Sequence, residues 1–361
     1  MAKGLLLNLS DLRIFVTGGA GFIGSRLCKR LTQADASVTA FDNLHPQVHG
    51  ENPAPFTACD LVVGDVRDRA ALYDALQASR PDVVIHLAAE TGTGQSADEP
   101  ARYCDVNVMG TTYLLESLKR LPTPPRRIVL AATRAAYGEG AYQNKKGELV
   151  VPQPRDSAAM ARGEFDLFDQ MGDRLTPIPT PEDCPLRPGS VYGSSKLMQE
   201  YLLQQTPVPW ETVRLRLQNV YGPGQSLQNP YTGVLSIFCQ QVLEGRTLRI
   251  FEDGEIYRDF VFVDDVVEAF ILGCVSAEAA NRVFNIGSGE RISIRFAAER
   301  ILEALGNTTS PEITGEFRAG DIRHAIADIS AAKANLGWSP QTDFAKGASL
   351  LAQWAMAEHD K

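Results

Sequence analysis

The sequence predicts an α/β protein made of a Rossmann-type, doubly wound parallel sheet and a smaller C-terminal lobe. Three observations lead to this fold class. Short β-type runs alternate with segments of helical period through the first half of the chain, which is typical of parallel βα units. The runs at residues 83–85 and 128–131 are continuously apolar, as strands buried on both faces are. A glycine-rich turn separates the first expected strand from the first expected helix.

The expected elements follow one another in a regular βα order. The strands are predicted at residues 13–17, 37–41, 61–63, 82–87, 127–131 and 212–217. The helices are predicted at residues 22–32, 69–78, 103–118 and 190–204. This alternation favours a single parallel sheet with helices on both faces.

The second half of the chain predicts a discontinuous domain boundary. We expect a Rossmann domain at residues 1–217, with residues 258–283 returning to it, because a strand-like run there precedes a helix-like one. Residues 218–257 and 284–361 are expected to form the smaller lobe, since the βα rhythm breaks into loops that contain Pro and Gly. Residues 139–189 show no sustained period and are predicted to be an inserted loop or flap. A cover over the site and a tolerated surface excursion both remain open.

Composition excludes several classes of protein. The hydrophobic share of 44% and charged share of 22% are those of an ordinary globular chain. A net charge of -9 repels polyphosphate and argues against nucleic-acid binding. No apolar run approaches a signal-peptide core or a membrane span, so we expect a cytoplasmic protein without membrane contact. The six cysteines and five histidines show no ligand spacing, so no metal site is expected.

The motif TGGAGFIG at residues 17–24 predicts a dinucleotide site. It follows an expected strand and opens an expected helix, which is the context that this motif requires. Gly18 and Gly21 permit a tight turn and close approach of a pyrophosphate, and Gly24 lets the helix lie near the sheet. The amino end of the helix favours the phosphate charge.

Two acids follow the next two expected strands. Asp42 is placed to accept hydrogen bonds from the adenosine ribose and to repel a 2′-phosphate, which favours NAD over NADP. Asp65 is placed either near the adenine or in a plain turn. The sequence leaves both interpretations open.

The segment YGSSK at residues 192–196 places a phenol and an amine on one face of a helix. A free tyrosine, with a pKa of ~10, is a poor base, but the Lys196 ammonium and a positive nicotinamide ring would stabilise the Tyr192 phenolate. Thr133 follows the expected strand at residues 127–131 and adds a hydroxyl at the same sheet edge. Tyr and Lys at this spacing are often an ordinary surface pair, so the glycine motif is the feature that favours catalysis.

These motifs resemble those of one enzyme family. Six segments are together similar to the extended short-chain dehydrogenase/reductase family of nucleotide-sugar epimerases and dehydratases. They are TGGAGFIGS, HLAA at 86–89, DVNVMGT at 105–111, YGSSK, RLQNVYGPGQ at 216–225 and RDFVFVDDVV at 258–267. The resemblance runs from residue 14 to about residue 340.

The resemblance implies roles for the side chains that match the family's motifs. Tyr192 is general base and acid, Lys196 tunes the pKa of Tyr192 and contacts the nicotinamide ribose, and Thr133 bonds to the reacting sugar oxygen. Asn107 matches a family asparagine that is more structural than catalytic. The expected NAD-binding residues are Gly18, Gly21, Phe22, Ile23, Gly24, Asp42, Asn43, Asp65, Val66, Leu87, Ala88, Ala89, Asn107, Tyr192 and Lys196.

The resemblance also implies a set of substrate contacts, which are Thr93, Thr133, Arg134, Asn219, Arg258, Arg318 and Asp321. Asn219 and Arg258 are assigned to the diphosphate. Arg318 and Asp321 are assigned to phosphate and nucleoside ribose, with Arg323 as a further candidate.

The two residues after Thr133 reduce the number of reaction types that the chain could catalyse. Sugar dehydratases of this family resemble one another in an Asp-Glu pair at that place, whereas Arg134 and Ala135 stand here. Decarboxylating relatives also place a glutamate near this position. Dehydration and decarboxylation are therefore disfavoured, because the carboxylate that each reaction needs is absent at these two positions. A 4-epimerase that oxidises C4, rotates the 4-keto sugar and reduces it again is favoured by the NAD-type Asp42. An NAD(P)H-dependent 4-ketosugar reductase is the alternative, and a non-catalytic NAD-sensing protein is a third interpretation.

Partners are implied by resemblance. The substrate is expected to be a UDP-, dTDP- or GDP-sugar. Relatives dimerise through helices at positions that match residues 98–118 and 190–204, so a homodimer is expected. The loop at residues 90–96, the TRAAYGEG stretch and the insertion are similar to dTDP-L-rhamnose 4-epimerase-like members of the family.

Overall fold

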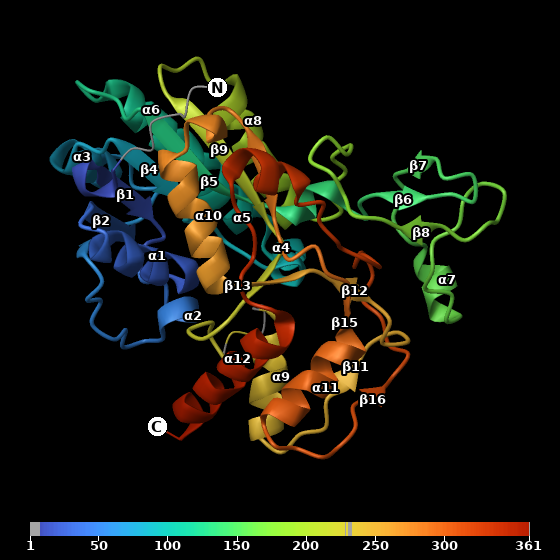
Figure 1. Ribbon diagram of the computed structural model, residues 1–361. Helices are drawn as coiled ribbons and strands as arrows, with labels where there is room; N and C mark the ends of the chain where they lie inside the picture. The colour runs from blue at the N-terminus through green and yellow to red at the C-terminus, as the bar shows by residue number, and fades with distance from the viewer. Residues whose placement is uncertain (1–7, 228, 230–232, 361) are drawn as a thin grey trace.

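The central element of the protein is a seven-stranded parallel sheet (Figure 1). The computed structural model describes residues 8–227, 229 and 233–360. The strand order is β14-β9-β5-β4-β1-β2-β3. The strands are β1 (Arg13–Thr17), β2 (Ser37–Asp42), β3 (Asp60–Val63), β4 (Val83–His86), β5 (Arg127–Thr133), β9 (Glu211–Leu217) and β14 (Val283–Ile286). The predicted Rossmann-type fold class is confirmed.

Helices cover both faces of this sheet because its side chains alternate between two apolar layers. In β1, Ile14 and Val16 pack with helices α1 (Phe22–Gln33) and α10 (Val263–Val275). Phe15 points to the opposite layer, which contains side chains of three other helices. Those helices are α3 (Arg69–Ser79), α6 (Gly110–Arg120) and α8 (Val191–Gln205). This period of two is what a strand buried on both faces requires.

The second lobe has its own apolar core, which lies below the sheet in Figure 1. Its helices are α9 (Val234–Leu243), α11 (Ile294–Ala304) and α12 (Phe344–His359), and its short strand pairs are β10 (Asn219–Tyr221) with β13 (Phe260–Phe262), β11 (Arg249–Ile250) with β16 (Glu312–Ile313), and β12 (Tyr257–Arg258) with β15 (Ile292–Ser293). The Tyr221 ring contacts the rings of Phe260, Phe262 and Phe344.

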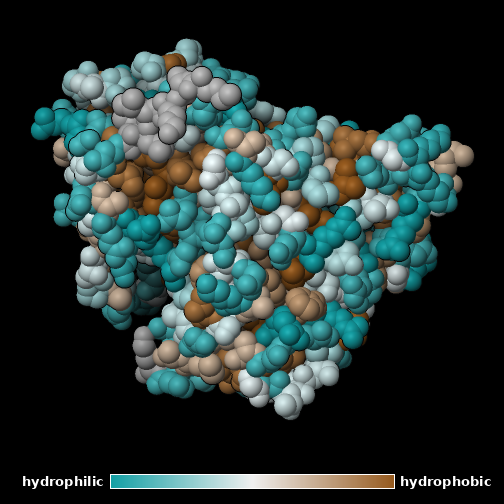
Figure 2. Space-filling view, viewed as in Figure 1, coloured by the Kyte–Doolittle hydropathy of each residue, from teal (hydrophilic) through white to brown (hydrophobic). Residues whose placement is uncertain are grey.

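Within the described part of the chain, no helix has the length and apolarity needed to cross a bilayer, and the face in Figure 2 is largely hydrophilic.

The return of the chain to the first domain differs from the prediction. Strand β13 pairs with β10 instead of joining the central sheet, while helix α10 packs against α1 and β5. Residues 284–286 belong to β14, which pairs with β9, so the predicted start of the second lobe at residue 284 is wrong. The strand escaped prediction because it is only four residues long and contains the polar Asn285.

The inserted segment is more regular than the sequence indicated. It contains a small antiparallel sheet of β6 (Tyr142–Gln143), β7 (Leu149–Val150) and β8 (Thr176–Pro177), together with helix α7 (Ser157–Ala161). In Figure 1 it projects from one side of the molecule. Strands of two residues are too short to show a period, which is why the pattern predicted only a loop.

The remaining short helices lie outside the insertion. They are α2 (Pro46–His49), α4 (Thr93–Asp98) and α5 (Pro100–Tyr103), and a π-helical turn, Cys104–Met109, joins α5 to α6.

Helix α8 is tied to the sheet by a buried ion pair. Arg216 of β9 donates from Nε and Nη2 to the Glu200 carboxylate of α8, at 3.0 and 2.8 Å. The two side chains are only 5% and 2% exposed. Removal of one partner would leave an uncompensated buried charge, so the pair fixes the position of α8.

We therefore expect Glu200→Ala to lower the free energy of unfolding by about 3–5 kcal/mol, because Arg216 loses its counter-ion in the interior. Urea unfolding followed by circular dichroism measures the change. Glu268→Ala is the control, since Glu268 pairs with Arg30 in the open and an exposed pair contributes about 0–1 kcal/mol. Equal effects of the two substitutions would contradict this role of the pair.

Candidate active site

A cavity of about 1300 Å³ opens between the carboxyl edge of the central sheet and the second lobe. Loops that follow β1 and β4 form part of its wall. These strands are neighbours at which the strand order reverses, and ligands of open α/β sheets bind at such a switch point. The volume exceeds the roughly 300–1,000 Å³ of a typical small-molecule pocket. It is therefore large enough for two ligands that meet end to end.

The glycine turn after β1 fits a dinucleotide pyrophosphate. Gly18 has a φ of +69°, and a Cβ there would lie 2.7 Å from the Ala88 nitrogen. A Cβ on Gly24 would lie 2.2 Å from the Gly18 carbonyl oxygen. Helix α1 begins at Phe22, so its free N–H groups face the cavity that the turn lines. Backbone without side chains at a helix amino end is what a pyrophosphate requires.

Asp42 braces this turn as well as lining the cavity. Its Oδ2 accepts a hydrogen bond from the Ala20 N–H at 3.0 Å, and its Oδ1 accepts one from the Leu44 N–H at 2.9 Å. The His49 Nε2 lies 3.5 Å from Oδ1. Burial alone would raise the pKa of Asp42, but His49 and the two N–H groups outweigh it and hold this pKa below its usual range. The carboxylate therefore stays charged at neutral pH.

Asp65 lies both in the cavity wall and in a hydrogen-bonded turn. It lines the cavity, but its carboxylate also accepts hydrogen bonds from the Arg67 guanidinium and N–H and from Asn43 Nδ2. The Arg67 hydrogen bonds lower the pKa of Asp65 to about 2. The residue is a turn aspartate that also faces the cofactor side of the cavity.

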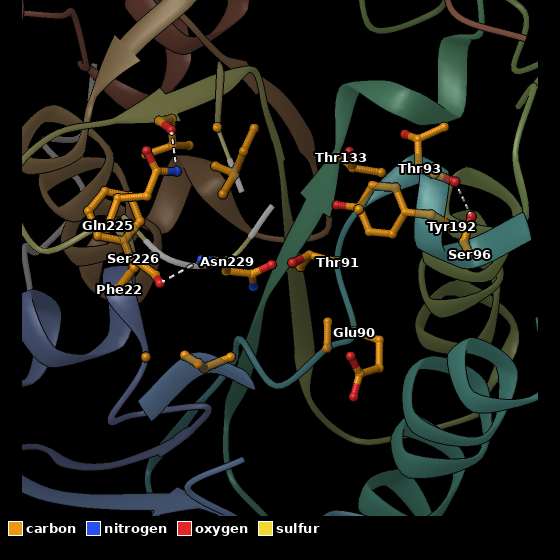
Figure 3. A pocket seen from close by; sticks show the side chains of 18 of the residues that line it. Phe22, Glu90, Thr91, Thr93, Ser96, Thr133, Tyr192, Gln225, Ser226 and Asn229 are labelled. Carbon is orange, nitrogen blue, oxygen red and sulfur yellow. Dashed lines mark hydrogen bonds between the residues drawn. The ribbon is translucent and has the colours of Figure 1, made fainter. Parts of the chain in front are cut away.

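Tyr192 and Thr133 lie side by side in the cavity wall, from α8 and from the end of β5 (Figure 3). Burial raises the pKa of the Tyr192 phenol, whereas a hydrogen bond with Thr133 and the charge of Arg134 lower it. The contribution of Arg134 was not predicted from the sequence. Arg134 follows Thr133 directly, lines the cavity, and has no hydrogen bond or ion pair to any described residue.

Lys196 lies one helical turn from Tyr192 and is only 3% exposed. Burial lowers the pKa of its amine to about 7. Its neighbour Ser195 accepts a hydrogen bond from Asn107 Nδ2 at 2.9 Å, and Asn107 also bonds to the backbone of Glu90 through both ends of its amide. Asn107 is fully buried and lies beneath the cavity, outside its wall. It joins α8 to the loop after β4.

The structure brings the other predicted residues to the same cavity. All of the expected cofactor residues except Asn107 line it, as do Thr93, Thr133, Arg134, Asn219, Arg258, Arg318 and Asp321. The Oδ1 atom of Asn219 is buried and has no hydrogen-bond partner among the described residues. Arg323, the further candidate, is buried outside the wall and pairs with Glu252 and Asp253.

The Arg258 guanidinium already forms hydrogen bonds to the protein, which its place in the sequence did not indicate. Its Nη2 donates to the Asp321 carboxylate at 3.1 Å and to the Ile322 carbonyl oxygen at 3.0 Å. Its Nη1 donates to the carbonyl oxygens of Tyr257 and Arg323. Arg258 therefore shapes the wall of the cavity in addition to facing it. Arg318 is exposed and lies 5.1 Å over the Phe251 ring.

Several polar cavity residues were missed. They are Glu90, Thr91, Ser96, Gln225, Ser226 and Asn229, which line the pocket and are labelled in Figure 3. Four of them lie in the loop at residues 90–96 or in the RLQNVYGPGQ segment, which end before Ser226 and Asn229. No local pattern separates the inward from the outward side chains of these segments. Among the described residues, none from 139 to 188 lines the cavity. Gly189, at the end of the insertion, does line it.

The sheet, the glycine turn and the Thr133, Tyr192 and Lys196 set define an enzyme that uses a nicotinamide dinucleotide. The chain belongs to the NAD dependent epimerase/dehydratase family, whose model matches residues 14–159 and 169–287.

Individual relatives cover nearly the whole chain. A dTDP-L-rhamnose 4-epimerase of Burkholderia thailandensis is 41% identical over 97% of this chain and 96% of its own. A UDP-glucose 4-epimerase of Mycolicibacterium smegmatis is 33% identical, with coverage of 95% and 98%. A crystal structure of Thermotoga maritima UDP-glucose 4-epimerase with UDP-glucose matches with a TM-score of 0.79 and 30% identity, covering 96% of this chain and 99% of that one. The Thermus thermophilus UDP-glucose 4-epimerase complex with NAD matches with a TM-score of 0.74 and 28% identity, covering 95% and 99%.

We expect Gly24→Ala to abolish tight NAD binding, because its Cβ would fall 2.2 Å from the Gly18 carbonyl and displace the turn. NAD released from denatured protein and quantified by chromatography measures the occupancy. Gly189→Ala adds the same methyl group where no heavy atom lies within 4 Å, so its NAD content should match the wild type. A Gly24→Ala protein with full NAD occupancy would show that the close approach is unimportant.

Proposed function

We propose that the protein is an NAD-dependent nucleotide-sugar 4-epimerase. The observation that carries this function is the pairing of Thr133 and Tyr192 in the cavity wall, with Lys196 one turn away and with Arg134 and Ala135 after Thr133. An elimination needs a carboxylic acid near the reacting carbon, and neither of the two residues after Thr133 is a carboxylate. Transfer of a proton and a hydride is the chemistry that this set supports.

The roles of the side chains follow from their positions. Bound NAD supplies the acceptor and donor of hydride. Tyr192 removes the proton of the C4 hydroxyl while Thr133 holds the oxygen through its hydroxyl. After the 4-keto sugar has rotated and presents the other face of C4 to the hydride donor, Tyr192 returns the proton to the C4 oxygen. Arg134 supplies positive charge near the phenolate, and Lys196 adds to it when its amine is protonated, which favours formation of the phenolate.

The substrate is a nucleoside diphosphate sugar, with the nucleotide held by the second lobe. Asn219 lines the cavity there, and Arg258, Arg318 and Asp321 supply the charged part of the wall. Among UDP-, dTDP- and GDP-sugars, dTDP-L-rhamnose is the first to test, because it names the relative with 41% identity. A 4-ketosugar reductase remains the second candidate, supported by the same triad. It would consume NADH in proportion to product, whereas an epimerase turns over without added NADH.

We expect Tyr192→Phe to reduce kcat for epimerisation by about 10²–10⁴-fold, since general acid–base catalysis contributes about this much. Product analysis by NMR measures turnover, and NAD content shows that the site remains intact. Tyr201→Phe is the matched control, because Tyr201 is an exposed tyrosine on the same helix, 38% exposed. A Tyr192→Phe enzyme with unchanged kcat would refute the assignment.

We further propose a cytoplasmic homodimer joined through the face of α8 and the π-helical turn before α6. Met109, Met198 and Tyr201 expose 38%, 44% and 38% of their area there, and apolar side chains of this size favour burial in a helical interface. Light scattering should give twice the chain mass of 39.3 kDa. Met198→Glu should shift the protein toward the monomer, and a wild-type monomer would refute the proposal.

A further inference from the structure

The inserted segment reaches the second lobe through one buried arginine. Arg155 lies between β7 and α7, yet its side chain is only 3% exposed. Its Nη1 and Nη2 meet the two carboxylate oxygens of Glu252 at 2.9 and 2.8 Å. Glu252 is 1% exposed and has a φ of +55°. A non-glycine residue keeps such a backbone conformation only where its surroundings fix it, and the two-pronged contact with Arg155 does so.

The same guanidinium holds the wall of the cavity. Nη2 of Arg155 donates to the Asp321 carbonyl oxygen at 2.8 Å. The Asp321 carboxylate in turn accepts from Arg258, which also holds the carbonyl oxygens of residues 322 and 323. Asp321 and Arg258 line the cavity, and Arg155 does not. The segment 321–323 is thus fixed by Arg258 on the cavity side and by Arg155 from the insertion.

Two other insertion residues complete this attachment. The Glu139 carboxylate accepts a hydrogen bond from the Arg323 N–H at 2.9 Å, and Asp166 lies 3.2 Å from the Arg323 guanidinium. Arg323 also shares the Glu252 carboxylate with Arg155, at 2.8 Å. Burial of this many charges is costly unless each is paired. A surface excursion without a role needs only exposed contacts, such as the pair between Lys145 and Asp173 in the same insertion.

We propose that Arg155 is a positioning residue for substrate binding, which acts by holding Asp321 and Arg258 in the cavity wall. It touches neither the cavity nor the triad, so its effect passes through the segment 321–323. The insertion is then a strut behind the nucleotide side of the site. This inference rests on the proposed function only in assigning that wall to the nucleotide.

Its test compares Arg155→Met and Arg155→Lys with the control Lys145→Met, all in the full-length holoenzyme. Calorimetric titration with dTDP and UDP gives Kd without turnover, and assays with dTDP-L-rhamnose and UDP-glucose give KM and kcat. We expect Arg155→Met to raise Kd and KM by about 10- to 100-fold, because a displaced binding group costs about this much. The kcat and NAD content should stay within about threefold of wild type. Arg155→Lys keeps the charge but loses the two-pronged geometry, so its Kd should lie between those of the wild type and of Arg155→Met. Lys145→Met should match the wild type.

Two results would overturn the proposal. One is a folded Arg155→Met protein with unchanged Kd and KM. The other is an equal loss of kcat, binding capacity and NAD content with Kd unchanged, which means a smaller folded fraction. If Arg155→Met does not fold, Arg155→Lys decides: a raised Kd supports the role and an unchanged Kd refutes it. A wild-type protein that binds dTDP or UDP but turns over neither sugar would contradict the proposed function alone, since the Kd comparison still tests Arg155.

Discussion

The position of helix α8 against the sheet is the constraint on which the site depends. Tyr192 and Lys196 lie on its first turns, and Thr133 ends the strand beside it. The buried pair of Glu200 with Arg216 fixes the far part of the helix, and the Asn107 hydrogen bond to Ser195 fixes the near part. Proton transfer needs heavy atoms within hydrogen-bond reach. A helix that shifted by one residue would separate the phenol from the Thr133 hydroxyl.

The two lobes divide the work of recognition. The carboxyl ends of the first strands offer bare backbone and two charged acids, Asp42 and Asp65, which suits a dinucleotide. The second lobe offers a wall of charged side chains, and Arg155 of the insertion holds the Asp321 backbone of that wall from outside the cavity. Arg134 stands between them as a cation without a partner in the described part of the chain, and burial together with Arg258 lowers its pKa to about 10. The division explains how a sugar can move while its nucleotide stays in place.

Local patterns predicted the first half of the chain well. The strand expected at residues 13–17 is β1, and the glycine turn and its acid lie where the motif placed them. These features are encoded by neighbouring residues. Strand β14, the pairing of β13 with β10 and the tiny sheet of the insertion depend on partners far along the chain, and no short window carries that information. The same holds for Arg323, which looked like a ligand contact in sequence but is neutralised by distant acids in space.

Reaction in heavy water tests the central claim most directly. If hydride leaves C4 of the sugar for bound NAD and returns to the same carbon, the epimerised product recovered from D₂O retains protium at C4, and no NADH accumulates. Mass spectrometry and proton NMR of the product show whether C4 carries protium or deuterium, and absorbance at the NADH band shows whether NADH accumulates. Deuterium at C4 would instead show proton abstraction from carbon, and it would contradict the roles of Tyr192 as the base for the hydroxyl and of the dinucleotide as the hydride carrier.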